Sequence, residues 1–330
     1  MTSMKFGMIF TGGTIGTVEN EDGVRVLDDR NESILMSCFE PDDTVLRSSP
    51  FMILSENIKP SDLNRLMDAV KNMIDSGAEG VIITHGMDTL QYTAAYLGYT
   101  FSNADIPIMI LTSFKPLDME GSNGITNLRC SIDFIRERRG SGVFVPFTDD
   151  NVRTYIHRGT RLLQNYDYEL GVRSISDSYY GFYDVDSFRP NSDSPKDAGS
   201  DMLSGIGLSE RSGIMVVRPC VGMPGIIVPD DAEDIILVPY RSGTMDLTDR
   251  VLIEFMEDCK TKGVRMWMVG KLPGIDYSSM AGLDSVRMLP KMTLVSAYMK
   301  LWMLKSADLD LEGMYVPCGC DLDHQDTERH

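Results

Sequence analysis

Short apolar runs alternate with amphipathic stretches along the first half of the chain. Apolar runs of strand length cover residues 4–10, 80–84, 106–111 and 142–145. Apolar positions at helical spacing cover residues 60–76, 89–97 and 128–138, and Ser61 is the expected N-cap of the first helix. Strands that alternate with helices in this way form a parallel sheet with helical crossovers. We therefore predict an α/β fold with a doubly wound, mostly parallel sheet, which binds ligands at the carboxyl ends of its strands.

The composition changes after residue 184. Ser, Asp, Pro and Gly dominate from there to residue 213, which is typical of a linker or a long surface connection. Beyond it, strand and helix patterns return at residues 214–217, 235–238, 247–261, 264–269 and 292–304. The sequence therefore predicts an N-terminal domain over residues 1–185 that carries the ligand pocket, a linker over 186–212 and a smaller C-terminal α/β domain over 213–330.

The net charge narrows the range of partners. The 330 residues include 31 basic and 49 acidic side chains, for a formal net charge of −18. Such an excess of negative charge repels phosphates, so we expect no nucleic-acid partner. Because no apolar run approaches the ~20 residues of a membrane helix and the first ten residues do not form a secretory signal, we expect a cytoplasmic protein without membrane contact.

The six cysteines fit free thiols in a reducing compartment. Only Cys318 and Cys320 have a suggestive spacing, since Asp321, Asp323 and His324 follow them closely. The usual two-residue gap between metal-binding cysteines is missing here. We therefore predict neither a metal nor another cofactor, and the role of the cysteine pair stays open.

Polar residues gather at two of the predicted strand ends. Thr11 to Thr14 follow the first strand, and Thr84 to Thr89 follow another. A threonine hydroxyl becomes a nucleophile only where a neighbour takes its proton. On spacing alone, Thr14 also fits a capped turn, and Asp88 fits an N-cap. The spacings of the Walker loop and of the dinucleotide fingerprint are both absent.

These segments resemble the L-asparaginase family, in particular its bacterial intracellular type. Residues 11–15 match the family's Thr-Gly-Gly-Thr-Ile, and residues 85–89 match its His-Gly-Thr-Asp-Thr with one change. The resemblance covers most of the chain and is strongest over residues 1–165. It implies the asparaginase fold, with a larger N-terminal and a smaller C-terminal domain.

The resemblance also implies a reaction. In the family, the threonine of the first motif attacks the side-chain amide carbon of asparagine, and water then hydrolyses the aspartyl-enzyme to aspartate and ammonia. A tyrosine on a mobile loop assists this threonine, and a second threonine, an aspartate and a lysine relay protons. Such help is needed because a threonine hydroxyl is a poor nucleophile at neutral pH, and the developing oxyanion needs hydrogen-bond donors.

The ligand-holding positions of the family are retained in this sequence. By the resemblance, Thr14 is the candidate nucleophile and Asp88 faces the ammonium group of the ligand. Ser55 and Glu56 fall on the loop that holds the ligand's carboxylate and ammonium, and Ser113 is a further substrate-binding candidate. The expected ligand is therefore a small amino acid similar to asparagine or aspartate.

Three catalytic positions of the family are replaced. The second threonine falls on Met87, the lysine on Gln164 and the tyrosine on Val24. None of these side chains supplies general acid or base chemistry. Lys115, Tyr166 and Tyr168 are the candidates to take over, and Thr244 replaces an asparagine through which the family completes its site from a second protomer.

Three functions stay open at this point. The leading interpretation is an asparaginase-family protein that binds asparagine or aspartate while its hydrolytic activity is weak or lost. The alternatives are an active amidohydrolase with Thr14 as nucleophile, or a non-catalytic subunit that pairs with a homologue. The resemblance further implies a homodimer or a homotetramer.

Overall fold

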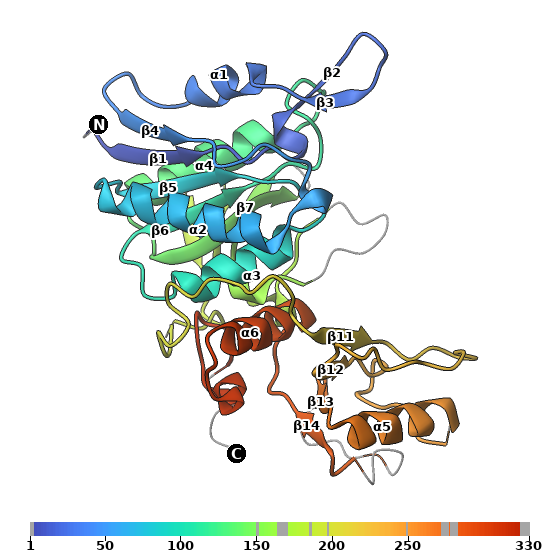
Figure 1. Ribbon diagram of the computed structural model, residues 1–330. Coiled ribbons are helices and arrows are strands. Elements are labelled where there is room, and N and C mark those ends of the chain that lie inside the picture. The colour runs from blue at the N-terminus through green and yellow to red at the C-terminus, as the bar shows by residue number, and fades with distance from the viewer. Residues whose placement is uncertain are drawn as a thin grey trace.

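The computed structural model describes residues 3–149, 152–163, 171–184, 187–196, 198–248, 250–271, 277 and 283–323. A large sheet with its helices forms the upper part of Figure 1, and a small sheet forms the lower part. The C-terminal helix α6 (Leu294–Ser306) lies between them. The position of α6 differs from the sequence-based expectation, which assigned this helix to the small domain.

The large sheet has eight strands. In order across the sheet they are β10 (Ser187–Pro190), β9 (Gly181–Asp184), β8 (Arg153–Arg158), β7 (Gly142–Asp149), β6 (Pro107–Leu111), β5 (Gly80–Thr84), β1 (Lys5–Ile9) and β4 (Thr44–Ser48). The five strands from β7 to β4 are parallel, and β8, β9 and β10 add to one edge as antiparallel strands. This confirms the predicted mostly parallel α/β sheet.

Helices cover both faces of this sheet, because its central strands are apolar on both sides. In β5, Val81 and Ile83 point into one buried cluster while Ile82 points into the other. The first cluster packs against α2 (Pro60–Asp75) and α3 (Leu90–Thr100). The second packs against α1 (Arg30–Met36) and α4 (Gly124–Arg136). Alternation along a strand thus places a helical layer on each face.

The start of helix α2 is set by its first residue, Pro60. Lys59, and not the expected Ser61, is the N-cap, and Pro60 occupies the first helical turn. The side chain of Asp62 accepts a hydrogen bond from the Lys59 backbone amide at 3.0 Å. Proline is favoured at this position because its fixed φ suits a helix and its missing N–H would be unpaired there anyway. The proline therefore sets the start one residue before Ser61.

The small sheet is parallel throughout. Its strands are β11 (Ile214–Val217), β12 (Asp234–Leu237), β13 (Arg265–Met268) and β14 (Val286–Met288). Helix α5 (Arg250–Lys262) covers one face of the sheet, and the other face lies toward α6. Asp234 links the small sheet to α6, because the carboxylate of this β12 residue pairs with Lys305 of α6 at 2.8 Å.

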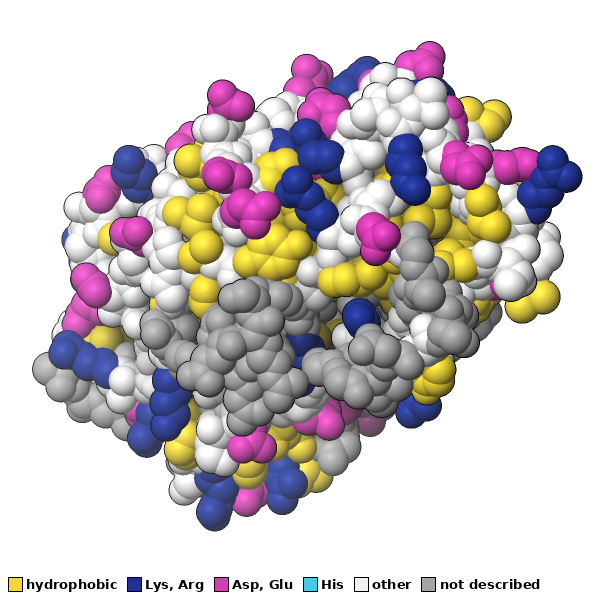
Figure 2. Space-filling model, turned by 90° about the horizontal axis from the view of Figure 1, so that it is seen from below, with side chains coloured by type: hydrophobic (Ala, Val, Ile, Leu, Met, Phe, Trp, Pro, Cys, Tyr) yellow, Lys and Arg dark blue, Asp and Glu magenta, His cyan; other side chains and the backbone are white. Residues whose placement is uncertain are grey.

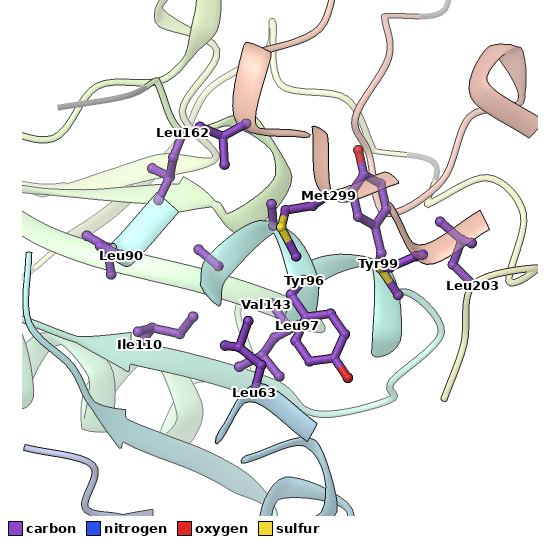
Figure 3. Packing of buried hydrophobic residues seen from close by; sticks show 14 of the residues in the cluster. Leu63, Leu90, Tyr96, Leu97, Tyr99, Ile110, Val143, Leu162, Leu203 and Met299 are labelled. Atoms are coloured by element: carbon purple, nitrogen blue, oxygen red, sulfur yellow. The ribbon is translucent and has the colours of Figure 1, made fainter. Parts of the chain in front are cut away.

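Helix α6 also packs against α3 of the large domain. The two helices share the largest apolar cluster, in which Figure 3 shows Ile110 and Val143 from the sheet, Tyr96 and Tyr99 from α3, and Met299 from α6. The Tyr99 hydroxyl oxygen also lies 3.3 Å from the Ser296 carbonyl oxygen. A helix that is apolar on all sides is typically buried on all sides, and α6 fits that rule because both sheets use it.

The predicted linker over residues 186–212 needs correction. Its first residues form β10, which pairs with β9 in the large sheet. Further along it, Leu203 and Leu208 are buried in the same cluster as α3 and α6. Gly199 forms a backbone bridge to Cys318. A Ser-, Pro- and Gly-rich composition favours turns, but it does not prevent single leucines from anchoring the segment to a core.

A buried polar cluster joins α3 and α6 to the residues that follow them. The Lys300 ammonium lies 2.8 Å from the Asp321 carboxylate, and both side chains are fully buried. Tyr99 donates to the same carboxylate oxygen at 3.1 Å, and the Cys318 amide donates to the other at 2.9 Å. The carboxylate of Asp321 thus organises the Cys318–Cys320 turn.

The cysteines of that turn are free and buried, and burial raises the pKa of the Cys318 thiol to about 11. The ranges that the structure covers hold no cluster of three metal-ligating side chains, and His324 lies outside them.

None of the described helices is both long and apolar enough to cross a membrane. On the molecular face shown in Figure 2, the Lys and Arg side chains of the described residues are interspersed with Asp and Glu side chains.

Candidate functional site

The ends of β1 and β5 are joined by two threonines. The backbone amide of Thr11 donates to the Thr84 hydroxyl at 3.0 Å, and the Thr11 hydroxyl donates to the Thr84 carbonyl. Both side chains are buried. These hydroxyls serve to hold the two strand ends side by side, so they are not free for chemistry.

Three loops meet at this edge of the sheet, at the residues Gly13, Gly86 and Ser55. Gly13 has a φ of +74°, and a Cβ built on it would lie 2.1 Å from the Gly86 nitrogen. A Cβ built on Gly86 would lie 2.5 Å from the Ser55 hydroxyl oxygen. Only glycine permits such an approach of backbone to backbone. The structure therefore brings together the two motifs and the Ser55 loop, which the resemblance placed around one ligand.

Thr14 follows this contact directly and begins the short 3₁₀ helix Thr14–Gly16. Its side chain is half-buried. Its carbonyl accepts a hydrogen bond from the Thr17 hydroxyl at 2.9 Å. Within the described residues no side chain forms a hydrogen bond with the Thr14 hydroxyl, so none is positioned to take its proton directly.

Ser55 connects the second motif to its own loop. Its hydroxyl donates to Asp88 Oδ2 at 3.2 Å, and its carbonyl accepts from the Thr89 hydroxyl at 2.9 Å. Ser55 is buried, whereas Asp88 and Glu56 are exposed. Both carboxylates thus remain accessible beside a buried hydroxyl.

Asp88 does not cap the helix that follows it. The N-cap of α3 is Thr89, which makes no side-chain capping bond. Asp88 bonds to the helix through its backbone carbonyl, which accepts from the side-chain Nε2 of Gln91 at 3.3 Å. The interpretation of Asp88 as an N-cap is therefore wrong. Its carboxylate instead accepts a hydrogen bond from the Ser55 hydroxyl and is exposed to solvent.

Met87 replaces the second family threonine with an apolar side chain. It is half-buried and packs against the large apolar cluster. Its thioether accepts hydrogen bonds only weakly and donates none. The position therefore contributes packing where the family has a proton-handling hydroxyl.

His85 is a structural residue. Its Nδ1 lies 2.7 Å from the Gly86 carbonyl and its Nε2 lies 2.8 Å from the Thr93 hydroxyl. Since a carbonyl only accepts, Nδ1 carries the proton and Nε2 accepts from Thr93. Complete burial lowers the pKa of the imidazole. His85 is thus neutral with both nitrogens occupied.

The end of β6 adds two hydroxyls. Ser113 and Thr112 are fully buried, and neither side-chain oxygen has a hydrogen-bond partner in the described part of the chain. A Cβ built on Gly124 would lie 3.3 Å from the Ser113 Cβ and 3.4 Å from Ile15, the neighbour of Thr14. Ser113 is one of the predicted substrate-binding residues, and Thr112 directly precedes it in the sequence.

Of the candidate replacements for the missing catalytic groups, Lys115 is the one that lies within the described residues. The Lys115 ammonium donates to the Glu120 carbonyl of its own loop at 3.2 Å and lies 5.7 Å from the centroid of the Phe114 ring. Gln164, Tyr166 and Tyr168 lie outside the described residues.

Val24 lies in a β-hairpin instead of a tyrosine-bearing loop. Strands β2 (Thr17–Glu19) and β3 (Arg25–Leu27) pair antiparallel, and Val24 in the turn is 56% exposed. Arg25 forms an ion pair with Asp118, which follows β6, at 2.6 Å. The residues from 17 to 27 include no aromatic side chain, so this hairpin itself offers no phenol to Thr14.

Comparison with known proteins relates this chain to one protein family. The family model "Asparaginase, N-terminal" matches residues 5–168. The thermostable L-asparaginase from Thermococcus kodakarensis superimposes with a TM-score of 0.75 at 23% identity, over 94% of this chain and 95% of that chain. L-asparaginase I from Vibrio cholerae gives 0.73 at 20% identity, over 95% and 96%. These solved structures have the same fold over nearly the whole chain.

Relatives with higher sequence identity match a smaller part. A glutamyl-tRNA(Gln) amidotransferase subunit of Metallosphaera sedula is 34% identical over 163 residues, which are 48% of this chain and 37% of that protein. The protein of the same name from Halobacterium salinarum is 28% identical over 196 residues, or 54% of this chain and 43% of that protein. The chain thus spans less than half the length of these curated relatives.

Proposed function

The chain belongs to the asparaginase family, and from this premise we propose that it binds an amino acid of the asparagine or aspartate type with little or no amide hydrolysis. The binding residues in this proposal are Thr14, Ser55, Glu56, Asp88 and Ser113. The observation that carries it is the contrast between Asp88, held by the Ser55 hydroxyl at 3.2 Å, and its neighbour Met87, which packs into the core.

Binding follows from the chemistry of the exposed groups. An α-amino acid presents an ammonium and a carboxylate a few ångströms apart. The accessible carboxylates of Asp88 and Glu56 suit the ammonium. The hydroxyl of Thr14 is free of described side-chain partners and suits the functional group at the end of the ligand side chain. Binding through these groups does not require the ligand to react.

Weak hydrolysis follows from the surroundings of Thr14. Attack by its hydroxyl needs a group that takes the proton. His85 is fully bonded, Lys115 bonds to its own loop, and Met87 has no suitable atom. The loss of one proton-transfer group typically costs ~10²–10⁴-fold in rate, so the loss of more than one leaves little turnover.

Titration with L-aspartate tests the binding half of this proposal. We expect saturable heat in calorimetry with the whole protein. Asp88→Asn removes the charge that faces the ligand ammonium and should weaken the affinity about tenfold. Asp68→Asn is the matched control, because Asp68 is an exposed residue of α2. Equal affinity of both variants, or no binding at all, contradicts the proposal.

A second candidate is a subunit that acts by pairing with another protein. The names of the sequence relatives favour it, because those proteins are called subunits of an amidotransferase. A homodimer or homotetramer is the simpler form of the same idea. Light scattering of the whole chain distinguishes the two: self-association alone supports the homo-oligomer, whereas a monomer that gains mass only with a copurified partner supports the pairing with another protein.

A further inference from the structure

The hairpin of β2 and β3 is bonded to the turn that carries Thr14. It projects from the edge of the large sheet at which β1 ends (Figure 1). At its base, the Thr17 hydroxyl donates to the Thr14 carbonyl at 2.9 Å. The buried carboxamide of Asn31 donates to the carbonyls of Ile15 and Thr17, each at 3.0 Å. The hairpin and the Thr14 turn thus form one hydrogen-bonded unit.

The tip of the hairpin is ordered by its own residues. The side-chain oxygen of Asn20 accepts from the Asp22 amide at 3.1 Å and from the Val24 amide at 2.8 Å. The Asn20 amide in turn donates to the Val24 carbonyl at 2.9 Å. Asparagine favours turns through such bonds to the backbone that follows it. Because the hairpin closes on itself in this way, a contact beyond it serves to place the hairpin and not to fold it.

One ion pair links the hairpin to a distant loop. The guanidinium of Arg25 donates to both carboxylate oxygens of Asp118, at 2.6 Å and 2.8 Å. A contact to both oxygens fixes the orientation of the two groups as well as their distance. The side chain of Arg25 is 29% exposed and that of Asp118 is 40% exposed. Salt in the solvent therefore screens this pair only in part.

The loop of Asp118 begins at Ser113, a binding residue of the proposed function. This loop also has its own internal bonds, since the side-chain oxygen of Asn123 accepts from the Phe114 amide at 3.2 Å. The ion pair thus joins two separately ordered units. One carries Thr14 and the other carries Ser113.

We propose that Arg25 and Asp118 are positioning residues, which hold the Thr14 turn beside the Ser113 loop so that both contact one bound amino acid. This inference rests on the proposed function, because it requires that Thr14 and Ser113 bind the same ligand. Without the ion pair, both units stay folded but a smaller fraction of the molecules holds the binding arrangement. The apparent affinity falls with that fraction. Since salt weakens a partly exposed ion pair, it also lowers the affinity through this pair.

Calorimetry of the whole protein with L-aspartate tests this role in two matched variants. Asp118→Asn removes the link between the loops. Glu19→Gln removes one negative charge from the same guanidinium, at 3.2 Å, but within the hairpin. We expect Asp118→Asn to weaken the affinity about threefold, which is the effect of one partly exposed ion pair, and Glu19→Gln to leave it unchanged.

The salt dependence of binding gives a second measurement, which a purely structural role would not change. Between about 0.05 M and 0.5 M salt, the wild-type protein should lose more of its affinity than Asp118→Asn does. Urea unfolding checks that Asp118→Asn and Glu19→Gln are equally folded under the conditions of the titrations.

The outcomes separate this inference from the proposed function. Weaker binding in Asp118→Asn alone, together with a smaller salt dependence, supports the positioning role. Unchanged affinity in Asp118→Asn, an equal loss in both variants, or an equal salt dependence in Asp118→Asn and the wild-type protein overturns it while the proposed function stands. No aspartate binding by the wild-type protein contradicts the proposed function itself, and this inference with it.

Discussion

The hydroxyl of Ser55 donates to the carboxylate of Asp88 at 3.2 Å, although 33 positions separate the two residues along the chain. The bond joins the loop that follows β4 to the loop that follows β5. Because the Gly13 and Gly86 backbones meet at the same place, it fixes a carboxylate beside the loop of Thr14. The predictions about ligand binding depend on this arrangement.

Ser55→Ala should weaken L-aspartate binding by about three- to tenfold, which is the effect of one hydrogen bond. The variant keeps the Asp88 charge but no longer orients it, so the loss should be smaller than with Asp88→Asn. Calorimetry at constant ionic strength measures both. A larger loss in Ser55→Ala than in Asp88→Asn is inconsistent with this role of Ser55.

Met87→Thr should raise the rate of ammonia release from L-asparagine, because it restores a hydroxyl at the second family position. If this is the main missing proton-transfer group, the gain is about 10²-fold. Met87→Leu keeps an apolar side chain and serves as the matched control. No gain with threonine would show that the remaining losses, or a different ligand, limit the reaction.

Lys300→Met should destabilise the fold strongly. It leaves the buried Asp321 carboxylate without its cation, and breaking such a pair typically costs about 3–5 kcal/mol. Adding Asp321→Asn should recover part of this loss by removing the unpaired charge. Arg250→Ala is the contrasting variant, since its exposed pair with Glu254 is worth less than about 1 kcal/mol. Urea unfolding measures all four proteins.

The stability should fall as the pH drops below about 6.5. Burial lowers the pKa of His157 from 6.5 to about 3, so between these values the unfolded chain binds a proton that the folded chain does not. The contribution is therefore complete above the unfolded pKa and declines toward pH 3, by at most about 1.4 kcal/mol per pH unit. In urea unfolding at several pH values, His157→Gln should show a shallower decline. An equal decline contradicts this role.

The central strands could be predicted because they are apolar without interruption. The segment Gly80–Thr84 is buried at every position, and its predicted bounds agree with the structure. Strand β8 was missed, since Arg153–Arg158 mixes charged and apolar residues and its pairing with β7 depends on distant residues. Sequence periodicity also cannot assign α6 to a layer, because a helix buried on all sides has no preferred face.

The candidate site could be predicted only through motifs. Spacing alone suggested that Asp88 capped a helix, whereas in the structure its carboxylate accepts a hydrogen bond from the Ser55 hydroxyl. Nothing in the local sequence around Ser55 signals this bond, since it forms only when two loops fold together. The paired roles of Thr11 and Thr84 were hidden for the same reason. Met87, in contrast, was identifiable because it interrupts an ungapped motif.

Ammonia release from L-asparagine tests the central claim most directly, when it is measured on a sample whose L-aspartate affinity is known. The account predicts saturable aspartate binding together with ammonia release near background, and the same low rate in Thr14→Ala. Rapid ammonia release that Thr14→Ala abolishes would contradict it, because Thr14 would then be a working nucleophile with a proton acceptor close by.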